Sequence, residues 1–255
     1  MNHQPRYYKK EGADTILIFI HGIVEGPDQF IDLMELSLKL GFSVASLLLP
    51  GHGGTGKDFA QSNKTQWINH VNTKIEFYKK NYKRVILCGH SMGVLLSFIH
   101  YVQYPDKVTC IIAIDSPLHV WVKKRAIKNN LKIGLSLKLD ENDPAQALLR
   151  ASSVAPCPLF TYIMWIPRIL DLFRLMKTTR NILHKVTIPT LVIHANKDEL
   201  VSISSLKVFK KAIPTTYLQI VRLPESTHFE YKGQDLATLH NVFTQFLHKV
   251  LTIPS

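Results

Sequence analysis

The sequence predicts a single α/β domain in which a mostly parallel, doubly wound sheet carries a helical lid insertion. Three observations support this fold class. Short apolar runs typical of buried strands alternate with segments of helical spacing along most of the chain. With 255 residues, of which 46% are hydrophobic, the chain is long enough to bury a large core. Residues 117–187 interrupt the alternation and contain no convincing strand.

Six segments are predicted strands because they are short and apolar, several of them continuously so, as expected when helices cover both faces of a sheet. They are residues 15–20, 43–49, 84–88, 110–114, 190–194 and 217–222. The spacing of apolar residues predicts helices over residues 29–40, 67–78 and 236–250. Asp28 is the candidate N-cap of the first helix, and Gly41 is its stop.

We assign residues 1–116 and 188–255 to the core and residues 117–187 to the lid. This insertion has mixed helical patterns and a high apolar content in its second half. An independent domain of this size would have a small core. We therefore expect it to lie over the carboxyl edge of the sheet. Additional helices packed elsewhere on the sheet are the alternative.

The formal net charge of +12 is largely local. Residues 117–187 contain twelve Lys and Arg against four Asp and Glu, so this segment carries +8. A local basic excess can attract anionic substrates or anionic lipid surfaces, whereas a solvated helical surface is the simpler explanation. Nucleic-acid binding is not expected, because the basic residues are scattered and no helix-turn-helix, zinc or RNA-binding signature accompanies them.

Nothing near the start of the chain reads as a targeting or transmembrane segment. The longest apolar run there, residues 16–20, is too short for the core of a signal peptide and for a membrane span. A cytoplasmic protein is the expectation. Cys88, Cys110 and Cys157 cannot all pair, and no metal-ligand spacing links them, so no metal is expected.

The most informative motif is Gly-His-Ser-Met-Gly at residues 89–93. It follows an apolar run and precedes a helical pattern that Pro105 ends, so it occupies a sharp strand-to-helix turn. The glycines let strand and helix approach closely, and the turn forces Ser91 into a strained backbone conformation. Such strain is costly to maintain, so the motif predicts that Ser91 is a catalytic nucleophile.

Four further sequence features stand in a fixed order around this motif. Two precede it, His21-Gly22 after the first strong strand and Leu-Pro-Gly-His-Gly at residues 49–53, and two come after it, Asp198 after a late strand and His228 near the end. With them the chain resembles the α/β-hydrolase family, most closely its carboxylesterase and monoacylglycerol-lipase-like members. The resemblance covers nearly the whole chain. It implies the α/β-hydrolase fold and a serine hydrolase that forms an acyl-enzyme on Ser91 without a cofactor.

The resemblance also assigns the partners of Ser91. A serine hydroxyl needs an adjacent base at neutral pH, and in this fold the order is serine, acid, histidine. His228 is therefore the base, on a polar loop between the last strand and the last helix, and Asp198 is the acid that holds the imidazole. Asp115, at the end of the strand after the nucleophile's helix, and Glu199 remain alternative acids.

An oxyanion hole needs backbone donors that are in place before the reaction. Met92, the residue after the nucleophile, is expected to supply one N–H, and the resemblance assigns the other to Ile23. Val24 and Glu25 follow here, so the sequence departs from hydrolases that carry a His-Gly-Gly-Gly run. His52 is interpreted as a turn-forming residue that borders the site.

Trp121, Phe160 and Trp165 are the candidate substrate-binding residues of an apolar lid wall that suits an acyl chain. The expected substrates are small-molecule esters with short to medium acyl chains, including monoacylglycerols. The basic side of the lid is expected to make transient contact with anionic lipid surfaces. The sequence does not indicate an oligomeric state.

Other classes remain open at this point. A thioesterase or an acyltransferase would use the same triad. A peptidase would call for acidic residues near the pocket, and the insertion has few. Haloalkane dehalogenases and epoxide hydrolases are disfavoured, because they carry aspartate at the nucleophile position. A binding protein that kept the fold and lost activity is the non-enzymatic alternative.

Overall fold

The computed structural model describes residues 3–134, 140, 143 and 145–252. Its sheet has seven strands in the order β1-β3-β2-β4-β5-β6-β7, and all neighbouring strands are parallel except the β1–β3 pair. The strands are β1 (Arg6–Tyr8), β2 (Thr15–Ile20), β3 (Ser43–Ser46), β4 (Arg84–His90), β5 (Val108–Ile114), β6 (Thr190–Ala195) and β7 (Leu218–Leu223). The α/β class and the mostly parallel sheet predicted from the sequence are confirmed.

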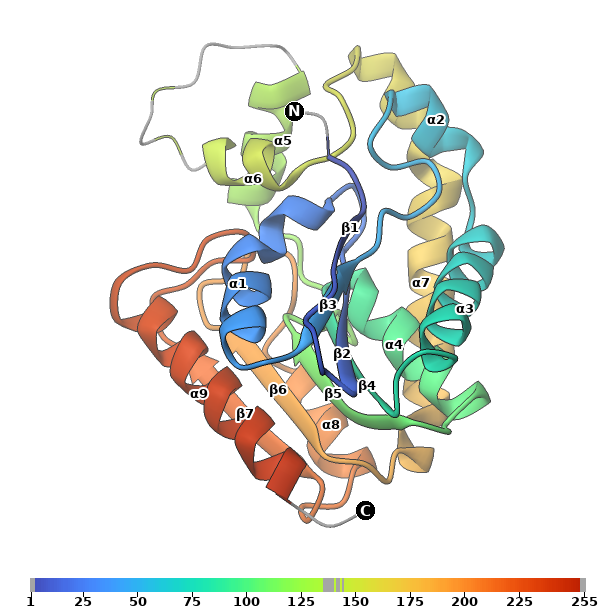
Figure 1. The fold of residues 1–255 in the computed structure, drawn as a ribbon. Helices are drawn as coiled ribbons and strands as arrows, with labels where there is room; N and C mark the ends of the chain where they lie inside the picture. The colour runs from blue at the N-terminus through green and yellow to red at the C-terminus, as the bar shows by residue number, and fades with distance from the viewer. Residues whose placement is uncertain (1–2, 135–139, 141–142, 144, 253–255) are drawn as a thin grey trace.

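Helices cover both faces of this sheet (Figure 1). They are η1 (Pro27–Phe30), α1 (Ile31–Lys39), α2 (Gly56–Gln61), α3 (Lys64–Lys79), α4 (Met92–Gln103), α5 (Lys124–Gly134), α6 (Ala145–Ala151), η2 (Leu159–Trp165), α7 (Ile166–Ile182), η3 (Leu183–Lys185), α8 (Ser205–Ala212) and α9 (Gly233–Thr252). The cores on the two faces follow from strand alternation. Ile16 and Ile18 face α3, α4, α7 and α8, whereas Leu17 and Phe19 face α1 and α9.

One local expectation was wrong, and one strand and one helix were missed. Asp28 does not cap the first helix: it lies inside η1 and pairs with Arg6 at 2.7 Å. Arg6 belongs to β1, a short polar edge strand whose sequence lacks the apolar pattern that predicts strands. Helix α8 also carried no prediction, although Leu206 and Phe209 on it are buried in the core.

Residues 117–187, predicted as one lid, divide into two parts. Helices α5 and α6 lie at one end of the molecule, near the N-terminus (Figure 1). In contrast, α7 runs beside α3 and α4, and Leu175 and Met176 on it are buried in the same core cluster as the sheet. The second half of the segment therefore belongs to the helical layer of the core. The apolar face of α7 is covered by α4.

The parallel strands bring the chemistry-bearing loops to one edge of the sheet. The carboxyl ends of parallel strands lie at the same edge, so the loops after β2, β4, β5, β6 and β7 converge there. Gly93 allows α4 to start directly against β2, since a Cβ at this position would lie 1.8 Å from the carbonyl oxygen of Ile20. This close approach brings Ser91 next to the turn after β2.

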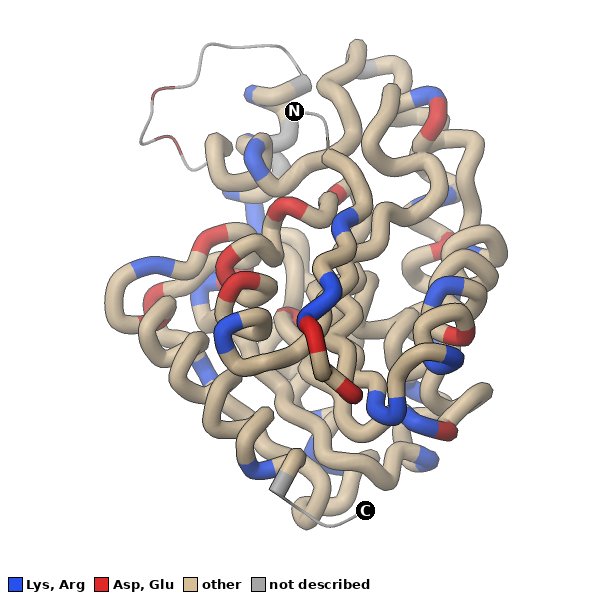
Figure 2. Tube along the Cα trace, in the orientation of Figure 1, with Lys and Arg blue, Asp and Glu red and all other residues tan. Residues whose placement is uncertain are grey.

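Basic and acidic residues are both distributed over several helices and loops (Figure 2). Figure 2 shows Lys and Arg along β1 and α3 as well as in the upper helical segment, so the positive charge is spread over several elements. Within the described ranges, no helix combines the length and the apolar character needed to cross a membrane.

Candidate active site

Ser91 lies at the turn between β4 and α4 with a backbone conformation that L-residues rarely adopt. Its φ is 51° and its ψ is −122°, and the residue is 5% exposed. The Ser91 amide donates to the carbonyl oxygen of Ile114 at 2.9 Å, which ties the turn to β5. A strained serine at the start of a buried helix is the local structure that the sequence motif predicts.

His228 and Asp198 form a buried hydrogen-bonded pair. Nδ1 of His228 donates to Oδ2 of Asp198 at 2.7 Å. The other carboxylate oxygen, Oδ1, accepts from the amides of Leu200 and Val201, each at 2.7 Å. Burial acts against both charges, yet their mutual attraction and hydrogen bond win: the pKa of Asp198 is lowered and the pKa of His228 is raised well above 6.5.

Asp115 is close to this pair but has a different set of partners. Its Oδ1 accepts from the amide of Ala195 at 2.7 Å, and its Oδ2 accepts from the hydroxyl of Tyr231. Burial, then repulsion from Asp198, raises the pKa of Asp115 to about 7. Glu199 reaches the backbone of His228, accepting from its amide at 3.3 Å. Of the three predicted acids, only Asp198 is hydrogen-bonded to the imidazole.

The turn after β2 is held by two histidines. Nε2 of His21 accepts from the amide of Leu49, and Nε2 of His52 accepts from the amide of Val24, both at 3.1 Å. Burial lowers the pKa of His21 to about 4 and that of His52 well below 6.5, so both rings are neutral acceptors at neutral pH. His52 thus braces the turn, as interpreted from the sequence. Ile23 lies between the braced residues.

The two predicted oxyanion donors are the backbone amides of Ile23 and Met92. Among the described residues, no group accepts a hydrogen bond from the backbone N–H of Ile23 or from that of Met92. Met92 is the first residue of α4, where an amide has no partner inside the helix. The same position places it at the positive end of the helix dipole, which favours an anion.

Glu25 is a site residue that sequence reasoning recorded only as a departure from a motif. Its carboxylate is 1% exposed and accepts from the amide of Gly22 at 2.6 Å and from Nδ1 of His90 at 2.8 Å. Oε1 of Glu25 lies 3.6 Å from Nε2 of His228. The sequence did contain a signal for this residue. Glu25 lies three residues after His-Gly, in the turn that follows a strand of the parallel sheet, and such turns lie at the carboxyl edge where the site forms.

Ser91 and His228, both within the described ranges, are not hydrogen-bonded to one another. Nε2 of His228 has no hydrogen-bond partner among the described residues, although it is buried. The loop that carries His228 is nevertheless anchored to the turn between β4 and α4, because Nε2 of His90 donates to the carbonyl oxygen of His228 at 3.1 Å. His90 is the residue next to Ser91, so the loop of His228 and the turn of Ser91 share one support.

Two clusters among the described side chains have residue types that bind divalent metals. They are Glu25, His90 and His228 in one cluster, and Asp115, Asp198 and His228 in the other, with ligand atoms within 4.8 Å of one another in each. His228 belongs to both clusters. A metal bound to its Nε2 would occupy the lone pair that a general base needs.

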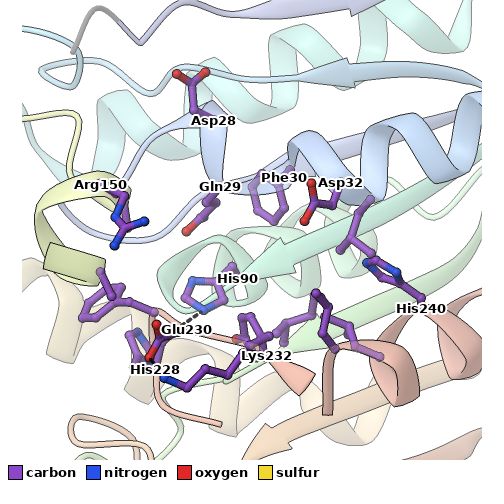
Figure 3. Close-up of a pocket in the computed structure, with 18 residues that line it drawn as sticks. Asp28, Gln29, Phe30, Asp32, His90, Arg150, His228, Glu230, Lys232 and His240 are labelled. Carbon is purple, nitrogen blue, oxygen red and sulfur yellow. Dashed lines mark hydrogen bonds and ion pairs between the residues drawn. The ribbon is translucent and has the colours of Figure 1, made fainter. Parts of the chain in front are cut away.

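A pocket of about 370 Å³ opens beside His90 and His228. Figure 3 shows the two rings side by side, with Arg150 from α6 and Gln29 from η1 facing them. Ser91 does not line this pocket. Of the predicted wall residues, Trp121 and Phe160 are 72% and 66% exposed. Trp165 packs edge-on against Phe59 and donates to the carbonyl oxygen of Gly56 at 2.9 Å.

A parallel sheet with a serine at the turn after β4, a carboxylate after β6 and a histidine after β7 defines the α/β-hydrolase class. The chain matches the family described as "Serine aminopeptidase, S33" over residues 11–230 and belongs to that family. The resemblance to α/β-hydrolases stated from the sequence is thereby confirmed.

Two distant curated relatives and a solved structure match most of the chain. A thermostable monoacylglycerol lipase of Bacillus sp. strain H-257 is 22% identical over 222 residues, which cover 87% of this chain and 85% of that one. A carboxylesterase of Bacillus subtilis strain 168 is 20% identical over 248 residues, or 96% and 97% of the two chains. A solved structure from work on two metagenome-derived lipolytic enzymes matches with a TM-score of 0.76 at 20% identity, covering 97% of this chain and 98% of that one. At this identity the structural likeness concerns the fold.

Proposed function

We propose that this protein is a carboxylic ester hydrolase that works through an acyl-enzyme on Ser91. One observation carries the proposal: a strained serine, two unoccupied backbone amides and a buried Asp–His pair are gathered at one edge of the sheet. The names of the two curated relatives, a monoacylglycerol lipase and a carboxylesterase, support the same reaction class.

In the proposed reaction, Nε2 of His228 takes the proton of the Ser91 hydroxyl while Oγ attacks the ester carbonyl carbon. The amides of Ile23 and Met92 receive the resulting oxyanion, and each such donor is worth about 3–4 kcal/mol. The imidazolium then protonates the leaving alcohol, and the acyl group remains on Ser91. Water repeats the sequence with His228 as base and releases the acid, which restores the free hydroxyl.

Asp198 is the proposed acid of this triad, because it accepts from Nδ1 of His228 and so directs Nε2 toward the reacting groups. Two backbone amides fix the carboxylate from the opposite side. Asp115 is occupied by Tyr231 and the amide of Ala195 instead. We therefore assign Asp115 a supporting role in the wall of the site.

The decisive experiment combines labelling and turnover. A fluorophosphonate probe should label wild-type protein and should fail to label the Ser91→Ala variant. A panel of p-nitrophenyl esters of increasing chain length should be hydrolysed, with the best rates among short to medium acyl chains. Folded wild-type protein that neither reacts with the probe nor hydrolyses any ester would disprove the proposal.

Thioester hydrolysis and acyl transfer remain alternatives because they use the same triad and differ in the substrate or the acceptor. Turnover of matched oxoester and thioester substrates separates hydrolysis of the two classes. Product analysis in the presence of an added alcohol detects transfer. We expect the oxoester to be the better substrate, since the curated relatives bear names of ester hydrolases.

The lid segment supports transient docking to an anionic lipid surface that presents acyl esters. Large apolar side chains on η2 and the start of α7 are exposed, and we call this group the apolar lid face: Phe160, Ile163, Met164, Ile166, Ile169, Leu170 and Phe173. Arg174 and Lys177 follow on the same helix and are exposed. Apolar side chains beside cations are typical of helices that bind the interface of a bilayer.

A further inference from the structure

Glu25 and His90 form a buried pair that the reaction above leaves without a role. Their side chains are 2% and 4% exposed, and Nδ1 of His90 donates to Oε2 of Glu25 at 2.8 Å. The other ring nitrogen, Nε2, donates to the carbonyl oxygen of His228. Both nitrogens of His90 therefore face oxygen atoms, and when Glu25 is ionised both contacts are hydrogen bonds if the ring carries a proton on each nitrogen. Glu25 is the counter-charge of that ring.

The carboxylate of Glu25 is fixed from several directions. It accepts from the amide of Gly22 at 2.6 Å and from the side-chain amide of Gln29 at 2.9 Å. Gly22 makes this approach possible, because a Cβ there would lie 2.4 Å from Oε1 of Glu25. Burial raises the pKa of Glu25, but attraction to His90 and His228 and the hydrogen bond from His90 outweigh it, so the net pKa falls below the ordinary range.

The pair touches His228 at two points. His90 holds the backbone carbonyl of His228, and the centroids of the two rings are 4.8 Å apart. Glu25 faces the other end of the imidazole, with Oε1 3.6 Å from Nε2. Nε2 is the atom that receives the proton of Ser91 in the proposed mechanism, and it has no hydrogen-bond partner among the described residues.

We propose that Glu25 and His90 are positioning residues that hold the general base His228 and set the pH at which it works. The proposal rests on the hydrolase function proposed above and identifies a second support for the base, opposite Asp198. Glu25 stabilises the imidazolium that forms when Nε2 accepts the proton of Ser91. His90 fixes the backbone of the loop and partly cancels the charge of Glu25, so that the imidazolium is not over-stabilised.

Other ionisable groups also act on His228 from the elements around it. They are Asp198 and Glu199 after β6, His194 within β6, Asp115 at the end of β5, and Tyr231 behind Asp115. Substitution of Glu25 or His90 leaves all of these groups in place. A change in the titration of His228 in such variants therefore reports on the pair itself.

The test is the acid limb of the pH dependence of kcat/KM with a p-nitrophenyl ester. Glu25→Gln keeps an acceptor for the Gly22 amide but removes the negative charge, so the midpoint should fall by about one pH unit. His90→Asn keeps a donor toward Glu25 but removes the positive charge, so the midpoint should rise by about one unit. Two opposite shifts are expected, because the two variants remove opposite charges next to the same ring.

Glu76→Gln is the matched control, since Glu76 is a carboxylate beside another buried histidine, His100, at 3.7 Å and lies on α3. Its midpoint should equal that of the wild type. Lower turnover at every pH with an unchanged midpoint in Glu25→Gln and His90→Asn would overturn the proposal and leave the pair a structural role only.

A second readout does not depend on activity. NMR titration of the His228 Cε1–H, assigned by comparison with His228→Gln, should show the same two shifts, and equal titration in all variants would overturn the proposal. If the variants show these NMR shifts but the wild-type protein hydrolyses no ester, the charge pair is retained and the proposed function is refuted. The two failures are therefore distinguishable.

Discussion

His228 lies among more negative than positive groups, and this has a consequence at the residue scale. Burial lowers the pKa of His228, but Asp198 and Glu25 raise it by more than burial lowers it, so the net pKa lies well above 6.5. In the proposed mechanism His228 must be neutral to accept the proton of Ser91, so activity should be lost as the pH falls below this raised pKa. We expect the acid limb of kcat/KM to lie above pH 6.5, with a tenfold loss per unit below it. A pH–rate profile with a midpoint below 6.5 would contradict this expectation.

Asp198 and Asp115 are separated by what each carboxylate touches. Asp198→Asn should lower kcat by about 10³–10⁴-fold, because an amide in place of the carboxylate leaves the imidazole in the wrong tautomer. Asp115→Asn should stay within about tenfold of wild type, since the amide can still accept from Ala195 and can donate to Tyr231. Steady-state kinetics of both variants provide the measurement, and a reversed order would reassign the acid to Asp115.

At the scale of single elements, α7 connects the lid to the core. Its first turns present the apolar lid face, whereas Leu175 on its later turns is 1% exposed and packs in the sheet's core cluster. Asp171, in the middle of α7, accepts from the amide of Lys64 at the start of α3, and this hydrogen bond joins the two helices. Asp171 also pairs with Arg174 one turn along α7.

Paired truncations on α7 test this division. Leu175→Ala should lower the free energy of unfolding by about 2–5 kcal/mol, the cost of a cavity in a packed core. Phe173→Ala, two residues away and 45% exposed, should change it by less than about 1 kcal/mol. Urea denaturation of both variants measures the difference. Equal small losses would mean that α7 is not part of the core.

At the scale of the whole molecule, the proposed docking to an anionic lipid surface combines the apolar lid face with the positive net charge of +12. Electrostatic attraction brings the protein to an anionic surface, and insertion of exposed apolar side chains then contributes about 1.5–3 kcal/mol each when they are fully buried. Attraction between exposed charges is screened beyond about 8 Å at physiological salt. Docking should therefore weaken as ionic strength rises.

Cosedimentation with phosphatidylserine-containing vesicles tests this surface. The double variant Ile163→Ser, Ile166→Ser should bind at least about tenfold more weakly than wild type, because two apolar side chains no longer enter the lipid. Phe77→Ser on α3, 56% exposed but outside the lid face, is the control and should bind like wild type. Equal binding by the double variant would place the contact elsewhere on the molecule.

Much of this molecule was predictable from local sequence. Six of the seven strands, the first and last long helices and the turn that carries Ser91 follow from apolar periodicity and from the glycines around the serine, which are signals contained within a few residues. The short polar strand β1 escaped prediction because it carries no local apolar signal. It forms by pairing with β3, which lies far along the chain.

The sequence by itself determined the α/β class and the sharp turn at Ser91, and it supplied the chain order from which the catalytic residues are proposed, since periodicity, turn chemistry and chain order are local or sequential properties. Only the tertiary structure decided which carboxylate meets Nδ1 of His228, that Glu25 and His90 face the same ring, and that α7 packs in the core. The physical reason is distance along the chain. Glu25, His90 and His228 come from three loops that a parallel sheet brings to one edge, and no local pattern encodes how their side chains then share protons.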